Sequence, residues 1–283
     1  MFDNGLVVTE TMVPVGGIEL CVETFGEPGD PALLLIAGAA SSMDWWEDEF
    51  CRRLAAGGRF VIRYDHRDTG RSTSFPAGAP PYSAVDLAND ALGVLDALGV
   101  YSAHLVGLSM GGELAQRIAV ERPHRVLSLT LIATGTQPAV AELAASARQP
   151  DWSDRRSAVR HIAAAVRGLG GLFTADEQHL RRLAERAYDR THDMAASQAN
   201  HRCCAPAPPV RQRLGSITAP TLVLHGTVDP LVPAEHARAL AAEIPGARLV
   251  PLEGVGHEVP PAAVWAAVID EVLALPGRHR QAA

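Results

Sequence analysis

The sequence predicts an α/β fold, in which helices flank a mostly parallel central sheet and a helical lid is inserted late in the chain. Apolar runs of strand length alternate with amphipathic stretches of helix length through much of the 283 residues. This alternation is typical of βαβ crossovers in a parallel sheet. Between residues 133 and 220 no strand-like run occurs. Such a stretch is too long for a loop in a compact domain, so it predicts an insertion of helices.

The elements follow in order along the chain. Two strand-like runs at residues 6–15 and 18–24 flank Gly16-Gly17, which predicts a hairpin. The unbroken apolar run ALLLI at residues 32–36 suits a strand that is buried on both faces. Later strands are expected at residues 60–64, 104–108, 126–132, 221–225 and 248–252. Helices are expected at residues 45–56, 82–98, 110–120, 153–169, 174–200 and 260–275, and directly after Pro233. The predicted division is an α/β core at residues 1–133 and 220–283 and a helical cap, or lid, at residues 134–219.

Charge and composition exclude several classes of protein. The formal net charge is -7 and the arginines are scattered, so the sequence lacks the basic stripe of a nucleic-acid-binding surface. All 25 basic residues are arginine. Without lysine the chain can form neither a lysine Schiff base nor a P-loop nucleotide site. Cysteine, histidine and carboxylate residues show no metal-ligand spacing, so we expect no metal and no other cofactor.

The cysteines and the N-terminus bear on location. The four cysteines show no redox spacing, and the neighbouring Cys203 and Cys204 would pair only with strain. The N-terminus lacks the apolar core of a signal peptide, and no apolar run reaches the length of a membrane span. A cytoplasmic protein without membrane association is therefore expected. The sequence leaves the oligomeric state open.

The strongest chemical signal is the pentapeptide at residues 107–111, Gly-Leu-Ser-Met-Gly. It lies directly after one predicted strand and directly before a predicted helix, which is the context of a nucleophile elbow. A turn this tight lifts the hydroxyl of Ser109 above the carboxyl edge of the sheet, where open α/β sheets bind their ligands. Ser109 is therefore the candidate nucleophile.

A serine hydroxyl needs a base to take its proton as it attacks. His257 follows the last predicted strand in a glycine-rich loop, where it could reach the same edge of the sheet. Asp229 follows the preceding strand and could fix the imidazole tautomer and stabilise the imidazolium. The order Ser109, Asp229, His257 is the one found in hydrolases that have a nucleophile elbow.

Two other carboxylates compete for the role of the acid. Glu235 falls in the helix after the strand at residues 221–225 and is expected to point to solvent. Glu258 adjoins His257 and cannot easily reach back to its neighbour's ring. The loop after the strand at residues 126–132 offers no carboxylate. Asp229 is therefore preferred.

Acyl transfer also requires donors for a developing oxyanion. One is expected from the backbone N–H of Met110, next to the nucleophile. The second is expected from the small-residue loop after ALLLI, with Ala39 favoured and Gly38 or Ala40 as alternatives. Trp45 could line the acyl pocket, although packing of Trp45 and Trp46 in the core explains the pair equally well. Both tryptophans cannot face inward on one helix.

These residues together resemble the α/β-hydrolase superfamily over nearly the whole chain apart from the insertion. The run RYDHRDTGRS at residues 63–72, with GLSMGG at residues 107–112, resembles bacterial esterases related to aclacinomycin methylesterase. Many relatives carry His-Gly where this chain has Ala37-Gly38, and glycine where it has Asp68-Thr69. The oxyanion donors are backbone groups, so the resemblance implies that catalysis survives these departures, and the shape of the pocket is expected to differ. Ser109 stands where dehalogenases and epoxide hydrolases of the superfamily carry a nucleophilic aspartate.

The function that the sequence favours is hydrolysis of a small-molecule carboxylic ester through an acyl-enzyme. A lactonase, a thioesterase, a C–C hydrolase or a cofactor-free perhydrolase could use the same three residues, since one fold hosts many chemistries. A ligand receptor built on a hydrolase scaffold is a further alternative, against which the intact Ser, Asp and His set argues. The natural substrate cannot be deduced from the sequence.

Overall fold

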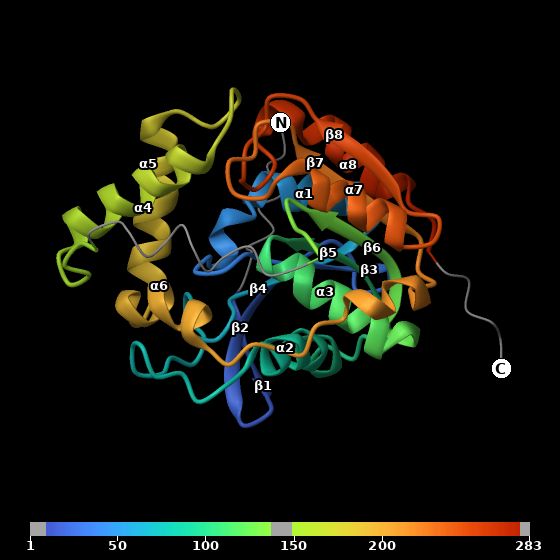
Figure 1. The fold of residues 1–283 in the computed structure, drawn as a ribbon. Helices are drawn as coiled ribbons and strands as arrows, with labels where there is room; N and C mark the ends of the chain where they lie inside the picture. The colour runs from blue at the N-terminus through green and yellow to red at the C-terminus, as the bar shows by residue number, and fades with distance from the viewer. Residues whose placement is uncertain (1–9, 137–148, 278–283) are drawn as a thin grey trace, which may run out of the picture.

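The computed structural model describes residues 10–136 and 149–277. Within them one sheet has the strand order β1-β2-β4-β3-β5-β6-β7-β8 (Figure 1). The strands β1 and β2 form an antiparallel hairpin, β2 also pairs antiparallel with β4, and all later pairs are parallel. The strands are β1 Thr11–Val15, β2 Ile18–Phe25, β3 Ala32–Ile36, β4 Phe60–Tyr64, β5 Ala103–Leu108, β6 Val126–Ile132, β7 Thr221–Gly226 and β8 Arg248–Leu252. The predicted mostly parallel α/β sheet is confirmed.

Helices lie on both faces of this sheet and in the long connection from β6 to β7. The α-helices are α1 Asp48–Ala56, α2 Ala84–Ala97, α3 Met110–Glu121, α4 Arg155–Leu169, α5 Glu177–Arg190, α6 Met194–Cys203, α7 Ala234–Glu243 and α8 Trp265–Ala274. Helices α2, α3 and α7 contribute to the apolar layer on one face, and α1 and α8 contribute to the layer on the other. The run ALLLI shows why two layers form: Leu34 and Ile36 belong to the first layer, Leu33 and Leu35 to the second.

The first helix begins later than the sequence suggested. Residues 45–56 were expected to form one helix, but only a short 3-10 turn spans Met43–Trp45 before α1 begins at Asp48. The Trp46 side chain is fully buried and stacks on Phe50, and its carbonyl accepts a hydrogen bond from the Arg63 guanidinium. Trp46 has a ψ of 87°, outside the helical region, so the 3-10 turn does not run directly into a helix. The chain therefore enters α1 only after Trp46.

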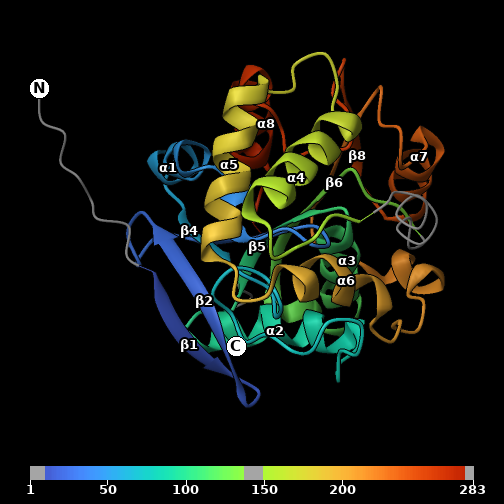
Figure 2. The same cartoon turned by 90° about the vertical axis from the view of Figure 1, so that its left-hand side faces the viewer.

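Helices α4, α5 and α6, which we call the inserted helices, lie on the left of the sheet in Figure 1, the side that faces the viewer in Figure 2. The single helix expected at residues 174–200 is wrong, because the structure has two helices there. Asp193 causes the second start: its carboxylate accepts the N–H of Ala196 and so caps α6. Asp176 caps the start of α5 in the same way through the N–H of His179.

Two contacts hold the inserted helices against the core. At the end of α5 the buried Arg190 guanidinium lies 2.6 Å from an oxygen of Asp44 and 2.8 Å from an oxygen of Asp65. At the end of α6 the fully buried Asn200 donates to the Asp68 carboxylate at 3.0 Å and accepts the N–H of Gly78 at 2.7 Å. Buried charges and amides are stable only when they are paired, so both sites fix where these helices sit.

A third contact joins the turn between α4 and α5 to the loop that carries His257. The His257 N–H donates to the Leu169 carbonyl at 2.7 Å, and the Leu172 N–H donates to the Gly254 carbonyl at 2.7 Å. The Glu258 carboxylate accepts the Gly171 N–H and the Thr174 hydroxyl, both at 2.9 Å. The turn and the loop are therefore connected through the main chain as well as through a side chain.

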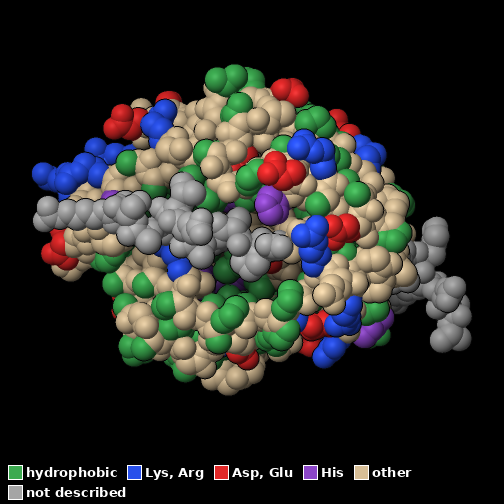
Figure 3. All heavy atoms as spheres, in the orientation of Figure 1, with side chains coloured by type: hydrophobic (Ala, Val, Ile, Leu, Met, Phe, Trp, Pro, Cys, Tyr) green, Lys and Arg blue, Asp and Glu red, His purple; other side chains and the backbone are tan. Residues whose placement is uncertain are grey.

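Surface charge and membrane propensity can be examined on the described residues. Basic and acidic side chains lie next to one another at several places on the face shown in Figure 3. Some of them form ion pairs, as Arg211 does with Glu243. Within the described residues, no helix combines the length and the apolarity needed to cross a membrane. Part of the predicted first strand, at residues 6–9, and residues 137–148 of the predicted cap lie outside the described residues.

Candidate active site

Ser109 lies between the end of β5 and the start of α3, in the conformation expected for an elbow. Its φ of 51° is in the left-handed region, which costs a non-glycine residue of order 1 kcal/mol or more. Its N–H donates to the Ile132 carbonyl at 2.9 Å, which ties the turn to β6. A Cβ at Gly111 would lie 2.2 Å from the Ile36 carbonyl oxygen, so only glycine permits this approach of α3 to β3.

The structure brings Ser109, His257 and Asp229 into one chain of hydrogen bonds. His257 Nε2 lies 3.0 Å from Ser109 Oγ, and His257 Nδ1 lies 2.9 Å from Asp229 Oδ2. Ser109 ends β5, Asp229 follows β7 and His257 follows β8, so all three come from the carboxyl edge of the sheet. The side chains of His257 and Asp229 are 8% and 1% exposed, so bulk water has little access to the bond between them.

Asp229 determines which ring nitrogen carries the proton. Its other oxygen, Oδ1, accepts the N–H groups of Leu231 and Val232, both at 2.8 Å. Burial alone would raise the pKa of Asp229, but its hydrogen bond to His257 and these backbone bonds outweigh burial and lower the pKa. An ionised carboxylate can only accept, so Nδ1 of His257 holds the proton. Its Nε2 lone pair therefore faces the serine hydroxyl.

The loop after β3 lies beside the serine. A Cβ at Gly38 would lie 3.5 Å from Ser109 Cβ, so even the smallest side chain at this position would touch the nucleophile. Ala40 has a φ of 58°, and its N–H donates to Nδ1 of His201 at 3.0 Å. Ala40 was one alternative as an oxyanion donor, and this engagement argues against it. Among the described residues we find no hydrogen-bond acceptor for the N–H of Ala39 or of Met110.

The two tryptophans have different surroundings. Trp46 belongs to the core layer that contains α1 and α8. Trp45 is only partly buried and packs against the apolar cluster that Val159, Leu180 and other side chains of the inserted helices form. Trp45 therefore joins the loop after β3 to the inserted helices.

The competing carboxylates lie where the sequence suggested. The Glu235 side chain is 70% exposed on α7. Glu258 points away from its neighbour's ring and accepts hydrogen bonds from the turn between α4 and α5. Neither carboxylate forms a hydrogen bond with His257 in the described structure.

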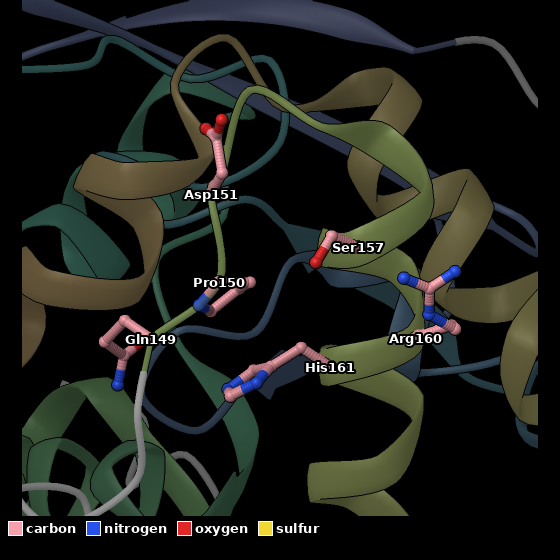
Figure 4. A pocket seen from close by; sticks show the side chains of 6 residues that line it. All are labelled: Gln149, Pro150, Asp151, Ser157, Arg160 and His161. Atoms are coloured by element: carbon pink, nitrogen blue, oxygen red, sulfur yellow. The ribbon is translucent and has the colours of Figure 1, made fainter.

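A polar cavity of about 520 Å³ lies at the start of the inserted helices (Figure 4). Ser157, Arg160 and His161 of α4 line one side, and the loop before the helix supplies the rest, with Gln149, Pro150 and Asp151. In Figure 4 the His161 ring extends toward Pro150. Ser109, His257 and Asp229 do not line this cavity.

Within residues 10–136 and 149–277, no group of three or more histidine, cysteine or carboxylate side chains is placed to hold a metal ion.

Sequence reasoning missed several residues that surround the site. His201 and Gln198 of α6 both form hydrogen bonds with the backbone of Ala40. His66, in the turn after β4, forms a hydrogen bond with the Ala37 carbonyl. His66 lies within the run RYDHRDTGRS, whereas His201 and Gln198 belong to no recognisable motif. They reach the loop only because α6 folds back over it, which a local pattern does not reveal.

Comparison with known proteins gives a consistent family assignment. The model of a family described as alpha/beta hydrolase fold matches residues 31–261. Rhodomycin D methylesterase DauP of Streptomyces sp. (strain C5) is 38% identical over 278 residues, covering 88% of this chain and 92% of the relative. Rhodomycin D methylesterase DnrP of Streptomyces peucetius is 37% identical with the same two coverages. Among solved structures, the enol-lactonase from Burkholderia xenovorans LB400 superposes with a TM-score of 0.73 at 26% identity, covering 93% of this chain and 98% of that one.

Proposed function

Because the chain belongs to the α/β-hydrolase fold family, we propose that it cleaves carboxylic esters with Ser109 as nucleophile, His257 as general base and Asp229 as the acid that orients the histidine. The chain is a carboxylic ester hydrolase on the strength of its methylesterase relatives. The observation that supports the residue roles is the unbroken path from Ser109 Oγ through the imidazole to Asp229, with steps of 3.0 and 2.9 Å.

The reaction runs in two halves. Ser109 Oγ attacks the ester carbonyl carbon while its proton passes to Nε2 of His257, and a tetrahedral oxyanion forms. The imidazolium then returns the proton to the oxygen of the departing alkoxide. The alcohol leaves, and the acyl group stays bound to Ser109 as an acyl-enzyme. In the second half His257 takes a proton from water as the hydroxide adds to the acyl carbon. The second tetrahedral intermediate then collapses, the imidazolium returns the proton to Ser109 Oγ, and the carboxylic acid departs. Asp229 stays ionised throughout and stabilises the imidazolium.

The proposed oxyanion donors are the backbone N–H groups of Met110 and Ala39. Met110 is the first residue of α3, where N–H groups have no partner inside the helix and where the helix dipole favours negative charge. Ala39 lies between Gly38, where an added Cβ would be in van der Waals contact with Ser109, and Ala40, whose own N–H is taken by His201. We propose Gly38, Ala40 and Trp45 as contacts of the bound substrate.

Methyl esters are the first substrates to test, because both named relatives are methylesterases. We propose screening methyl esters of bulky acids beside nitrophenyl esters of increasing acyl length, lactones and thioesters. Ester turnover by the parent protein supports the proposal, as does labelling of Ser109 by a fluorophosphonate. Turnover of lactones or thioesters in preference to every ester would favour the alternatives, and tight ligand binding with no turnover would indicate a receptor.

We propose that residues 134–219 form a cap over an α/β core of residues 1–133 and 220–283. The support is that β6 ends at Ile132, β7 begins at Thr221, and the inserted helices bind both the loop after β3 and the loop with His257. A cap in this position would shape the acyl pocket and determine selectivity.

Cutting back the apolar contact between core and cap is expected to change selectivity. We expect Trp45→Ala and Val166→Ala to alter the ratio of rates on short and long acyl esters by about 10-fold, because small changes in an apolar pocket are worth about 1–3 kcal/mol. The rate of fluorophosphonate labelling, which reports the reactivity of Ser109, is expected to change much less. The measurement is kcat/KM on a series of nitrophenyl esters, with Tyr101→Ala as a surface control. Unchanged ratios in both variants would contradict the role of the cap.

On the acid side of the pH profile of kcat/KM, activity is expected to depend on the ionisation of one group only. The base must be neutral to accept the serine proton, so kcat/KM falls as His257 becomes protonated. The pKa of Asp229 is lowered, so it remains ionised across this range and adds no second step. Burial lowers the pKa of the neighbouring His225, which therefore stays neutral. Log kcat/KM is expected to rise with a slope of one and then level off; a slope of two would show that Asp229 titrates in the same range.

The location we propose is the cytoplasm, because the four cysteines are free thiols as in proteins of reducing compartments. The proposed partner is a small-molecule ester, and nothing in the mechanism calls for a metal, a cofactor or a nucleic acid.

A further inference from the structure

The N–H that we assign to the oxyanion belongs to the peptide plane between Gly38 and Ala39, and nothing within that plane fixes it. Gly38 has no side chain, and Ala40 is held at a φ of 58°, a conformation that alanine does not prefer. A segment of this kind must be held from outside if its N–H is to point at the reacting carbonyl. Preorganised donors are what make an oxyanion hole effective, because they need no reorientation during the reaction.

The next plane along the chain is held by α6. His201 Nδ1 accepts the Ala40 N–H at 3.0 Å, and His201 Nε2 lies 2.9 Å from the Arg67 carbonyl oxygen. A carbonyl can only accept, so Nε2 carries the proton and Nδ1 presents a lone pair. Burial lowers the pKa of His201, which favours this neutral form. The Gln198 amide donates to the Ala40 carbonyl at 3.3 Å, so both backbone groups of Ala40 are engaged by one helix.

The preceding plane is held by a second buried histidine. His66 Nε2 lies 3.1 Å from the Ala37 carbonyl oxygen, to which it must donate. Burial lowers the pKa of His66 to about 3, so its ring is neutral as well. The rings of His66 and His201 meet edge to face with centroids 5.6 Å apart. The plane that carries the Ala39 N–H therefore lies between two planes that neutral imidazoles hold.

We propose that His201 is a positioning residue for ester hydrolysis: by accepting the Ala40 N–H, it orients the loop after β3 so that the Ala39 N–H faces the oxyanion. The inference rests on the proposed function. It assigns to the cap helix α6 a part in transition-state stabilisation, without contact between His201 and the substrate. The fold of α6 does not depend on His201 alone, because Asn200 binds Asp68 and Gly78 independently.

Two variants of similar size separate the acceptor at Nδ1 from the donor at Nε2. In His201→Asn the side-chain oxygen can take the place of Nδ1 and accept the Ala40 N–H. In His201→Gln the amide lies nearer the place of Nε2, so it can donate to Arg67 while the Ala40 N–H loses its acceptor. We expect kcat on a nitrophenyl ester to fall on the order of 10²-fold in the Gln variant, with KM little changed, because the donor is misplaced only in the transition state. The Asn variant is expected to keep most of the parent kcat.

A second readout distinguishes positioning from a general loss of structure. A boronic acid that forms a tetrahedral adduct with Ser109 occupies the oxyanion hole, so its affinity is expected to fall with kcat in the Gln variant. Cys203→Ser is the matched control on α6, because this exposed thiol bonds only to carbonyls of its own helix. If the His201 variants do not fold, Gln198→Met provides the test. It releases the Ala40 carbonyl and a contact with Met194 Sδ on its own helix, keeps the bond from Ala40 to His201, and is expected to give a smaller fall in kcat.

The outcomes separate this inference from the function on which it rests. A parent protein without Ser109-dependent ester turnover would refute the proposed function and this inference with it. An active parent together with a folded His201→Gln variant of unchanged kcat and boronate affinity would refute the inference alone. If no His201 variant folds, a Gln198→Met variant with the kcat and boronate affinity of the parent would also refute the inference alone.

Discussion

Replacing Ser109 by alanine is expected to reduce ester turnover on the order of 10⁶-fold, the loss that removal of the nucleophile causes in the serine-protease template. The physical reason is that the path from Asp229 through His257 would end in a methyl group, so no acyl-enzyme could form. The measurement is kcat for a nitrophenyl ester, with mass spectrometry of the fluorophosphonate adduct on the parent protein.

Stability provides the control for this variant. The Ser109 side chain contributes only a hydroxyl at a strained position, so its removal creates no core cavity and the melting temperature is expected to change little. Retained turnover in Ser109→Ala, or an adduct on another residue of the parent, would contradict the assignment of the nucleophile.

Asp229→Asn is expected to lower turnover by a factor on the order of 10⁴ while the fold is kept, as the equivalent change does in the serine-protease template. The amide can donate to the ring, so the Nδ1 proton would move to Nε2 and the lone pair would no longer face Ser109. The Asp229 oxygen that accepts the N–H groups of Leu231 and Val232 is retained as the amide oxygen, which preserves the turn. The measurement is kcat beside the melting temperature.

Two carboxylates provide matched controls for Asp229. Glu235→Gln changes an exposed side chain on α7 and is expected to leave kcat as it is. Glu258→Gln weakens the bonds from Gly171 and Thr174 without touching the imidazole, and so is expected to change kcat much less than Asp229→Asn. An active Asp229→Asn variant beside an inactive Glu258→Gln variant would show that the wrong carboxylate was chosen.

The parts of this molecule that local rules govern could be predicted from the sequence. The alternation of apolar runs predicted every strand of the described sheet, because β3, β5 and β7 are buried on both faces and need unbroken apolar sequences. The ends of three parallel strands meet at one edge of the sheet, and Ser109, Asp229 and His257 each follow one of them. The order of these residues in the chain was therefore sufficient to predict that they lie close together.

The predictions that were wrong concern features that depend on tertiary contacts. The helix expected at residues 45–56 starts late because Trp46 is buried in the core with a non-helical ψ of 87°, bonded to Arg63 of β4. The helix expected at residues 174–200 is divided because Arg190 must end at a buried pair of aspartates while Asp193 starts a new helix. The engagement of Ala40 by His201 could not be foreseen, since 161 positions separate the two residues and no pattern connects them.

The contact between the α4–α5 turn and the loop of His257 has a consequence for how the enzyme loses activity under stress. Hydrogen exchange shows that proteins open in cooperative units, and residues that share main-chain hydrogen bonds tend to open together. The His257 N–H ends on Leu169, while Val255, two residues earlier, is bonded to Leu252 and Val228; we therefore expect release of the inserted helices to free His257, the proposed general base, from its backbone anchor. Mild heat or denaturant that releases these helices would therefore inactivate the enzyme while the sheet is still protected from exchange. Catalytic half-life would then be a property of the cap, and stabilising the sheet alone would not extend it.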